Sequence, residues 1–210
     1  FRIITLGDSY TFGDNVNTKE NYPERLEDIL NDNSLCKTSR KFEVINLGFS
    51  GYYIEYSVYR FKVRGQKYNP DLVLWFIKND DFSEINELIK PKVDQYKAEI
   101  SADPALLAEF QSKGNFYPWS TKARQELKAE LGEDSILAYS KKALWRINDY
   151  YKGKIIFITF SGKRQLKDSQ LTILQSFAME RGNTYIYDGL SLSYDKLEDN
   201  AHPTGKGYAQ

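Results

Sequence analysis

The six residues Leu72-Val73-Leu74-Trp75-Phe76-Ile77 are all apolar, and a charged residue stands on either side of the run. A run of this length fits a strand better than a helix. A strand that is solvated on one face alternates apolar and polar residues, whereas a strand buried on both faces loses that alternation. Residues 71–77 are therefore predicted to form a strand inside a parallel sheet that has helices on both faces.

Similar runs, rich in Ile, Val, Leu and aromatic residues, predict four further strands over residues 2–6, 43–47, 154–160 and 184–187. Amphipathic stretches between them predict helices over residues 22–30, 54–65, 136–151 and 169–182. Strands that alternate with helices are typical of the α/β class. Ligands of such sheets bind beyond the carboxyl ends of the strands, so residues that directly follow a strand are the first candidates for a functional site.

One region interrupts this alternation. Residues 82–134 contain two or three amphipathic helical pieces and no strand, so we expect a single domain over residues 1–210 with a helical insertion at 82–134. The insertion follows the third predicted strand and should lie over or beside a site at that edge of the sheet. Two readings stay open: a helical hairpin that only packs, or a cap that shapes an acyl or sugar pocket.

Composition narrows the classes of partner. The 29 basic and 29 acidic side chains cancel and the basic residues are scattered, so nothing predicts binding to nucleic acid. Cys36 and His202 are the only residues of their types, which excludes an intrachain disulfide and a zinc site built from Cys and His. No apolar stretch approaches the roughly 18 residues of a membrane span. Because the chain begins with Phe1, we expect a fragment or processed form; a secreted, membrane-anchored or cytoplasmic location and the oligomeric state stay open.

A serine directly follows the first predicted strand, in Gly7-Asp8-Ser9-Tyr10. There it can stand clear of the sheet as a nucleophile, although Gly, Asp and Ser are also common in plain turns. A serine hydroxyl needs a base within hydrogen-bond reach, and an imidazole has a suitable pKa. Asp199 precedes His202 by three residues, so its carboxylate can fix the imidazole tautomer. These residues predict Ser9 as nucleophile and His202 as base, oriented by Asp199.

Ester chemistry also requires donors for the negative charge that develops on the carbonyl oxygen. Gly48 and Gly51 follow the second predicted strand, where a backbone amide can approach a ligand closely. Asn79 follows the third and offers a side-chain amide. Each is also explained as a turn residue, but together they place donors at the ends of successive strands.

In these four blocks the chain resembles the SGNH (GDSL-type) hydrolase family. Gly7-Asp8-Ser9 is similar to the first block, Gly51 to the second, Asn79 to the third, and Asp199 with His202 to the final Asp-x-x-His, all in family order. The resemblance implies a three-layer α/β/α fold around a parallel sheet of about five strands, of flavodoxin-like type. It also implies hydrolysis or transfer of acyl groups without a metal or organic cofactor. The Ser9 amide, the Gly51 amide and the Asn79 side chain would be the oxyanion donors.

The third block departs from the family pattern, because Ile77 stands where the family usually has glycine. A branched side chain there is expected to narrow the site or to shift the loop that holds Asn79. Asp8 and Tyr10 beside the nucleophile, and Trp119 in the insertion, are the predicted substrate contacts.

Three functions are compatible with these residues. We expect an esterase that removes small acyl groups, such as acetate, from a carbohydrate. An acyltransferase would use the same triad with an acceptor hydroxyl in place of water. A non-catalytic relative would bind a glycan or a protein partner, but binding alone does not require Ser9, Asp199 and His202 together. The 16 tyrosines would suit a surface that stacks on sugars, and equally a packed core.

Overall fold

In the computed structural model, which describes residues 1–32, 34, 37–83, 85–114, 117–190, 196 and 202–209, five strands form one parallel sheet in the order β2-β1-β3-β4-β5. The strands are β1 (Arg2–Leu6), β2 (Glu43–Asn46), β3 (Leu72–Ile77), β4 (Lys154–Phe160) and β5 (Thr184–Leu190). The prediction of an α/β fold with a central parallel sheet is confirmed, and the apolar run is the middle strand.

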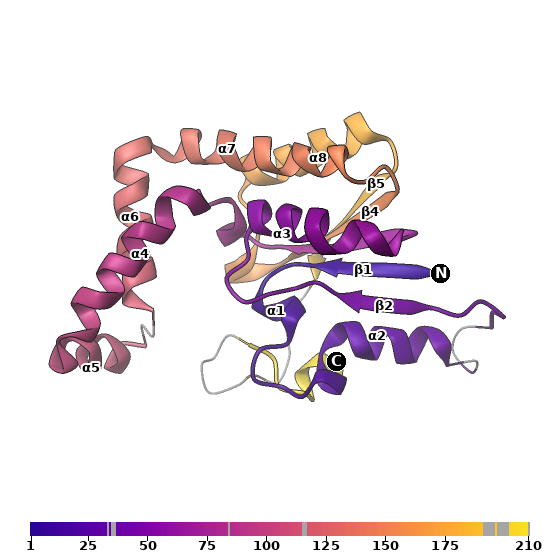
Figure 1. Ribbon diagram of the computed structural model, residues 1–210, viewed down its shortest axis with the longest axis horizontal. Coiled ribbons are helices and arrows are strands. Elements are labelled where there is room, and N and C mark those ends of the chain that lie inside the picture. The colour runs from indigo at the N-terminus through magenta and orange to yellow at the C-terminus, as the bar shows by residue number, and fades with distance from the viewer. Residues whose placement is uncertain are drawn as a thin grey trace.

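Helices cover both faces of the sheet (Figure 1). One face carries α3 (Ile54–Arg60), α7 (Glu133–Trp145) and α8 (Asp168–Arg181), and the other carries α2 (Tyr22–Asn31). Alternate residues of β3 serve the two layers: Val73, Trp75 and Ile77 belong to the larger core, and Leu74 packs in the smaller core on the α2 side. This division explains why the strand has no polar alternation.

Local signals in the sequence set the helix ends. The Asn21 side chain accepts a hydrogen bond from the Glu24 amide at the start of α2, and Gly182 ends α8 in the left-handed region at φ 74°. The helix predicted over residues 54–65 changes after Arg60 into a π-helical turn, Phe61–Gly65. At its end the buried Phe61 ring lies so close to Gly65 that a Cβ there would come within 2.7 Å of it.

Short 3-10 turns complete the body, at Thr18–Glu20, Gln66–Tyr68, Asn79–Phe82, Arg146–Asp149, Gly162–Arg164 and Gly207–Ala209. None of the helices described in the structure is long and apolar enough to cross a bilayer.

The insertion forms an arm of three helices, α4 (Asn86–Ser101), α5 (Pro104–Ser112) and α6 (Pro118–Leu131). The arm projects beyond the carboxyl ends of the strands, at the left of Figure 1. It has a small core of its own, made by Ile85, Ile89, Ala123, Leu127 and Ile136. Lys92 of α4 joins Glu126 and Glu130 of α6 at 2.7 and 2.8 Å.

Candidate active site

Ser9 is the first residue of a four-residue helix, α1 (Ser9–Phe12), which starts where β1 ends. Gly7 makes the turn at φ 145°, and a Cβ there would come within 2.3 Å of the Thr11 hydroxyl. The Asp8 carboxylate caps the helix by accepting a 3.0 Å hydrogen bond from the Tyr10 amide. This tight turn holds Ser9 at the carboxyl edge of the sheet.

His202 lies beside Ser9, with its Nε2 atom 2.7 Å from the Ser9 hydroxyl oxygen. The Tyr10 ring supports the imidazole from the side, with a centroid distance of 5.2 Å. The Tyr208 hydroxyl donates to the Tyr10 carbonyl oxygen at 2.8 Å, which ties the C-terminal segment to α1. An imidazole at this distance can accept the proton of an attacking serine. Asp199 lies outside the described residues.

Two backbone amides at this edge of the sheet remain available for a ligand. The N–H groups of Ser9 and Gly51 donate to no other residue in the described part of the chain. Gly51 is in the left-handed region at φ 73°, and a Cβ there would touch nothing within 4 Å. The Gly48 amide, by contrast, already donates to the Asn46 side chain at 2.9 Å. Of the two candidate glycines, only Gly51 therefore keeps a donor for an oxyanion.

Asn79 begins the 3-10 turn that follows β3. Its carbonyl oxygen accepts a 3.0 Å hydrogen bond from the buried Gln170 side chain of α8, which anchors this turn to the helix layer. Because β2, β1 and β3 are neighbours and parallel, the loops that contain Gly51, Ser9 and Asn79 leave the sheet at the same edge.

The expectation that the Ile77 side chain narrows the site is wrong, whereas a shift of the loop that holds Asn79 stays a prediction. Its side chain is fully buried in the core on the α3 face, together with Val73 and Trp75. Successive side chains of a strand point to opposite faces, and position 77 falls on the face that packs against α3, α7 and α8. A branched residue at this position therefore fills the core.

Lys78, which was not among the predicted site residues, connects the loop that follows β3 to the turn that holds Ser9. Its Nζ atom lies 3.0 Å from the Asp8 carboxylate, 3.4 Å from Asp80 and 3.6 Å from Asp81, and 5.5 Å from the centre of the Tyr53 ring. Burial alone would lower the pKa of Lys78, but the surrounding carboxylates raise that pKa above its ordinary value. A lysine at the end of an apolar strand, followed by two aspartates, was the available signal for a buried ion cluster.

The side chains of Asp8 and Tyr10 are occupied within the protein. The Asp8 carboxylate is 10% exposed and bonds Lys78 and the Tyr10 amide. Tyr10 is 6% exposed, and its ring lies between those of His202 and Phe160. Both residues shape the turn around Ser9, and their contact with a substrate stays a prediction.

Trp119 belongs to α6 in the arm. Its described ring contacts are with Tyr117 and with the Lys97 ammonium of α4. These contacts join two arm helices, so its role as a substrate contact also stays a prediction.

A cavity of about 250 Å³ borders Asn79 and Asp80 on the side of the helix layer. It separates this corner of the site from the arm and is lined further by Arg124 and Lys128 of α6. Arg164 reaches Asp80 at 2.5 Å. Burial would raise the pKa of Asp80, but Lys78, Arg164 and Arg124 together keep that pKa below its ordinary value. Asp80 is therefore ionised, is paired with cations and lies at the rim of the site.

No protein-family model and no curated protein matches the sequence. Solved structures do resemble the fold. TesA superposes with a TM-score of 0.53 at 13% identity, over 100% of this chain and 92% of its own. The Clostridium thermocellum family 3 carbohydrate esterase gives 0.54 at 16% identity, over 99% and 89%. A two-domain esterase active on acetylated mannans gives 0.53 at 12% identity, over 100% and 46%. At these identities the likeness establishes the three-layer α/β/α fold.

Proposed function

We propose that this chain, which has the fold of the SGNH hydrolases, is a serine esterase that acts on carboxylic esters. The observation that supports this most directly is the 2.7 Å contact between the Ser9 hydroxyl and His202 Nε2, two residues from opposite ends of the chain. A second support is the pair of uncommitted amides, of Ser9 and Gly51, at the same edge of the sheet.

In the proposed reaction, the Ser9 oxygen attacks the ester carbonyl carbon while His202 Nε2 accepts the hydroxyl proton. The oxyanion of the tetrahedral intermediate accepts hydrogen bonds from the Ser9 amide, the Gly51 amide and the Asn79 side chain. The intermediate collapses, and the alcohol leaves with the proton held by His202. Water then gives a proton to His202 and attacks the acyl carbonyl carbon. The bond from that carbon to the Ser9 oxygen breaks, the Ser9 oxygen takes the proton back from His202, and the acid is released. Asp199 orients His202 in this proposal.

We further propose that the substrate is a carbohydrate ester of a small acyl group such as acetate. Two of the structures that share the fold are described as a carbohydrate esterase and as an esterase active on acetylated mannans. Those descriptions belong to those proteins, and for this chain they only indicate which substrates to assay first.

The proposal is tested with a fluorophosphonate probe and an aryl acetate, on the parent and on Ser9→Ala. We expect Ser9→Ala to lose labelling and to lower kcat by about 10⁴-fold or more, because the acyl-enzyme cannot form. The control is Ser176→Ala on α8, whose hydroxyl donates to the Thr172 carbonyl oxygen. Labelling or hydrolysis by Ser9→Ala at the parent's level would exclude this mechanism. Adding an acceptor sugar to the same assay separates hydrolysis from acyl transfer.

A further inference from the structure

We propose that a row of aromatic side chains, leading from the nucleophile turn to a cavity between α3 and α7, binds a linear oligosaccharide. The inference rests on the proposed function and makes it narrower: the esterified alcohol would be a sugar within a glycan chain. We name this row the aromatic path and define it by Phe12, Phe49, Tyr52 and Tyr56.

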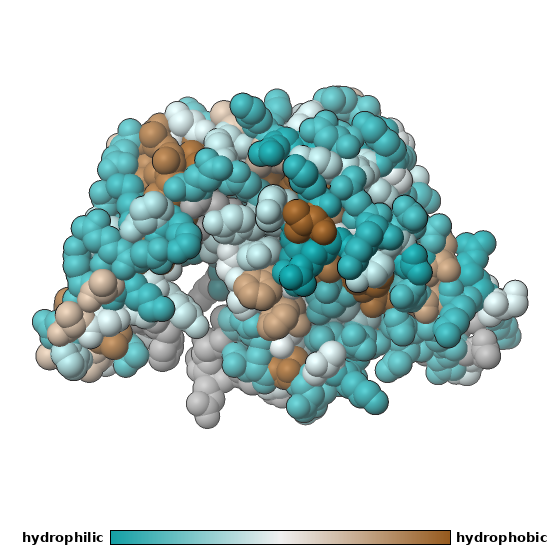
Figure 2. All heavy atoms as spheres, in the orientation of Figure 1, coloured by the Kyte–Doolittle hydropathy of each residue, from teal (hydrophilic) through white to brown (hydrophobic). Residues whose placement is uncertain are grey.

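The rings of the path form consecutive contacts. Ring centroids are 5.5 Å apart from Phe12 to Phe49, 4.8 Å from Phe49 to Tyr52 and 5.2 Å from Tyr52 to Tyr56. Phe12 is 42% and Phe49 41% exposed, so part of each ring remains open to a ligand. Figure 2 shows hydrophobic atoms at the surface in the middle of the molecule, over α1.

The path begins at the candidate active site. Phe12 closes the short helix that Ser9 opens, and Tyr52 directly follows Gly51, whose amide is a proposed oxyanion donor. The Arg60 guanidinium lies over the rings of Phe49 and Tyr52, at 5.1 and 5.6 Å from their centres, and adds a hydrogen-bond donor beside the path. A glycan lying on these rings would thus have one sugar next to Ser9.

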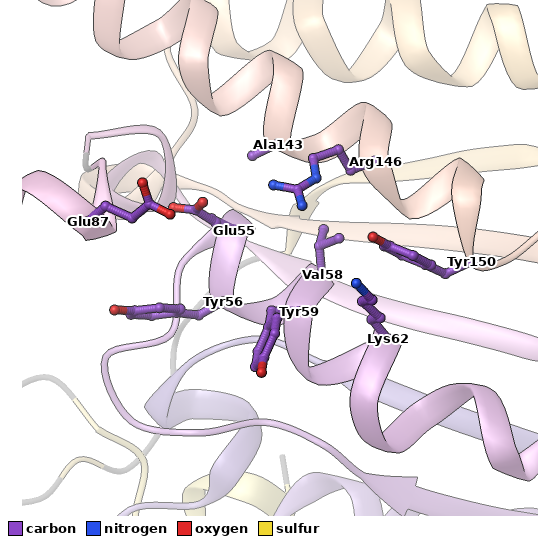
Figure 3. Close-up of a pocket in the computed structure, with 9 residues that line it drawn as sticks. All are labelled: Glu55, Tyr56, Val58, Tyr59, Lys62, Glu87, Ala143, Arg146 and Tyr150. Carbon is purple, nitrogen blue, oxygen red and sulfur yellow. The ribbon is translucent and has the colours of Figure 1, made fainter.

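The path ends in a cavity of about 340 Å³, shown in Figure 3. Tyr56 lines it, as does Tyr59, which is 59% exposed. On the opposite side the Lys62 ammonium lies over the Tyr150 ring, 5.2 Å from its centre. The cavity therefore has aromatic side chains on two sides, and the Lys62 ammonium lies at one end.

Two carboxylates, of Glu55 and Glu87, line this cavity together with the Arg146 guanidinium. The side chains of Glu55 and Glu87 point toward one another in Figure 3, and neither forms a salt bridge within the described residues. One oxygen of Glu55 accepts a 2.7 Å hydrogen bond from the Tyr139 hydroxyl, and the other has no hydrogen-bond partner there. Glu87 is exposed and lines the cavity, so its carboxylate can accept hydrogen bonds from the hydroxyls of a ligand.

These features fit a sugar chain better than a fatty acyl chain. A pyranose ring has an apolar C–H face that stacks on aromatic rings and a rim of hydroxyls that bonds carboxylates and guanidinium groups. The ring-to-ring steps along the path are close to the length of one sugar unit. An acyl chain in the same place would cover Glu55, Glu87 and Arg146 without offering hydrogen bonds, which is costly.

The test compares Tyr56→Ala and Tyr59→Ala with a matched control, Tyr185→Ala. Tyr185 is 55% exposed and lies near the start of β5, at the opposite end of the strands from Ser9. Three substrates are assayed: 4-nitrophenyl acetate, acetylated xylo-oligosaccharides and acetylated manno-oligosaccharides. We expect Tyr56→Ala, in the path, and Tyr59→Ala, in the cavity at its end, each to leave kcat/KM for the aryl ester within about twofold and to raise KM for the oligosaccharides by about tenfold. The Tyr185 variant should change neither.

Direct binding supplies an independent readout. Calorimetric titration with unacetylated oligosaccharides should show a Kd that weakens about tenfold in Tyr56→Ala or Tyr59→Ala. Equal effects of the path and control variants, or a parent that binds neither oligosaccharide, would overturn the aromatic path. If labelling through Ser9 persists in that case, the proposed esterase stands without it. If labelling is absent but the sugars bind through the tyrosines, the path stands and the esterase fails.

Discussion

At the scale of single residues, a buried ion pair positions the turn that holds Ser9. The Lys78 side chain is 7% and the Asp8 side chain 10% exposed, and their 3.0 Å contact joins the loop after β3 to the loop after β1. A buried ion pair adds little net stability compared with apolar packing, but removal of one partner leaves the other charge stranded. The pair therefore acts mainly by positioning, because the second oxygen of Asp8 caps the helix that begins with Ser9.

Lys78→Met should accordingly damage both stability and turnover. We expect unfolding to become easier by about 3–5 kcal/mol, because Asp8 and Asp81 would be left buried without a cation. The double variant Lys78→Met/Asp8→Asn should recover part of this loss, while kcat for an aryl acetate stays low and KM changes little. Urea unfolding and steady-state kinetics measure the two effects. A single variant that keeps both parental stability and parental kcat would show that Lys78 positions nothing.

Glycines 48 and 51 illustrate how position decides a residue's role. A Cβ on Gly48 would come within 2.6 Å of the Phe12 amide and of Thr11, so this glycine lets two backbone segments approach. Gly51 meets nothing within 4 Å, and only its positive φ favours glycine. Gly48 is thus a packing residue, whereas Gly51 presents an unused amide.

At the scale of elements, one exposed carboxylate joins three helices. Glu133, the first residue of α7, accepts from Lys128 of α6 at 2.7 Å and from Lys167 next to α8. These hydrogen bonds lower the pKa of Glu133 to about 2. The carboxylate is half exposed, so its contribution is small and screened by salt.

The depressed pKa of Glu133 determines how its stabilisation of the folded state depends on pH. The folded state prefers the ionised form, so the stabilisation is present above the ordinary pKa of 4.5 and is lost as the pH falls toward 2. Glu133→Gln should remove this part of the acid sensitivity. Hydrogen exchange at the α6–α7 junction, followed from pH 5 to pH 2.5 in low and high salt, measures it. Identical acid profiles for parent and variant would contradict the assignment.

At the scale of the whole molecule, the sheet and the arm each have a hydrophobic core, and the two cores differ in size. The sheet core holds the site. The arm core of Ile85, Ile89, Ala123, Leu127 and Ile136 includes one residue of α7, and Arg124 of α6 donates a hydrogen bond to the Tyr53 hydroxyl of the body. The arm helices α4 and α6 contact each other extensively, and further pairing comes from Lys92. We therefore expect the arm to open without unfolding of the sheet.

Leu127→Ala tests this expectation. Leu127 is 1% exposed, and its truncation should weaken the arm core by about 2–5 kcal/mol. Hydrogen exchange should then speed up in α4 and α6 and stay slow in β1, β3 and β4. An equal loss of protection in the sheet would show that arm and body unfold as one unit.

Much of the architecture was readable along the chain. The apolar run 72–77 predicted a strand buried on both faces, and five strands with their helices were confirmed with shifts of a few residues at their ends. The largest shift is at the end of α7, which stops at Trp145 and passes into the 3-10 turn Arg146–Asp149; β5 also extends to Leu190. Periodicity is a local property, so it predicts which segments become strands and helices.

The alternation of strands and helices, and the candidates Ser9, Gly51, Asn79 and His202 in separate loops, can be read from the sequence. Which of these residues come into contact depends on the tertiary structure. The strand order β2-β1-β3 gathers three of those loops at one edge, and the chain's return brings His202 within 2.7 Å of Ser9. Tertiary packing likewise places the Ile77 side chain in the core and the Lys78 side chain against Asp8. The physical reason is that burial and charge pairing depend on neighbours distant in sequence, which no local pattern records.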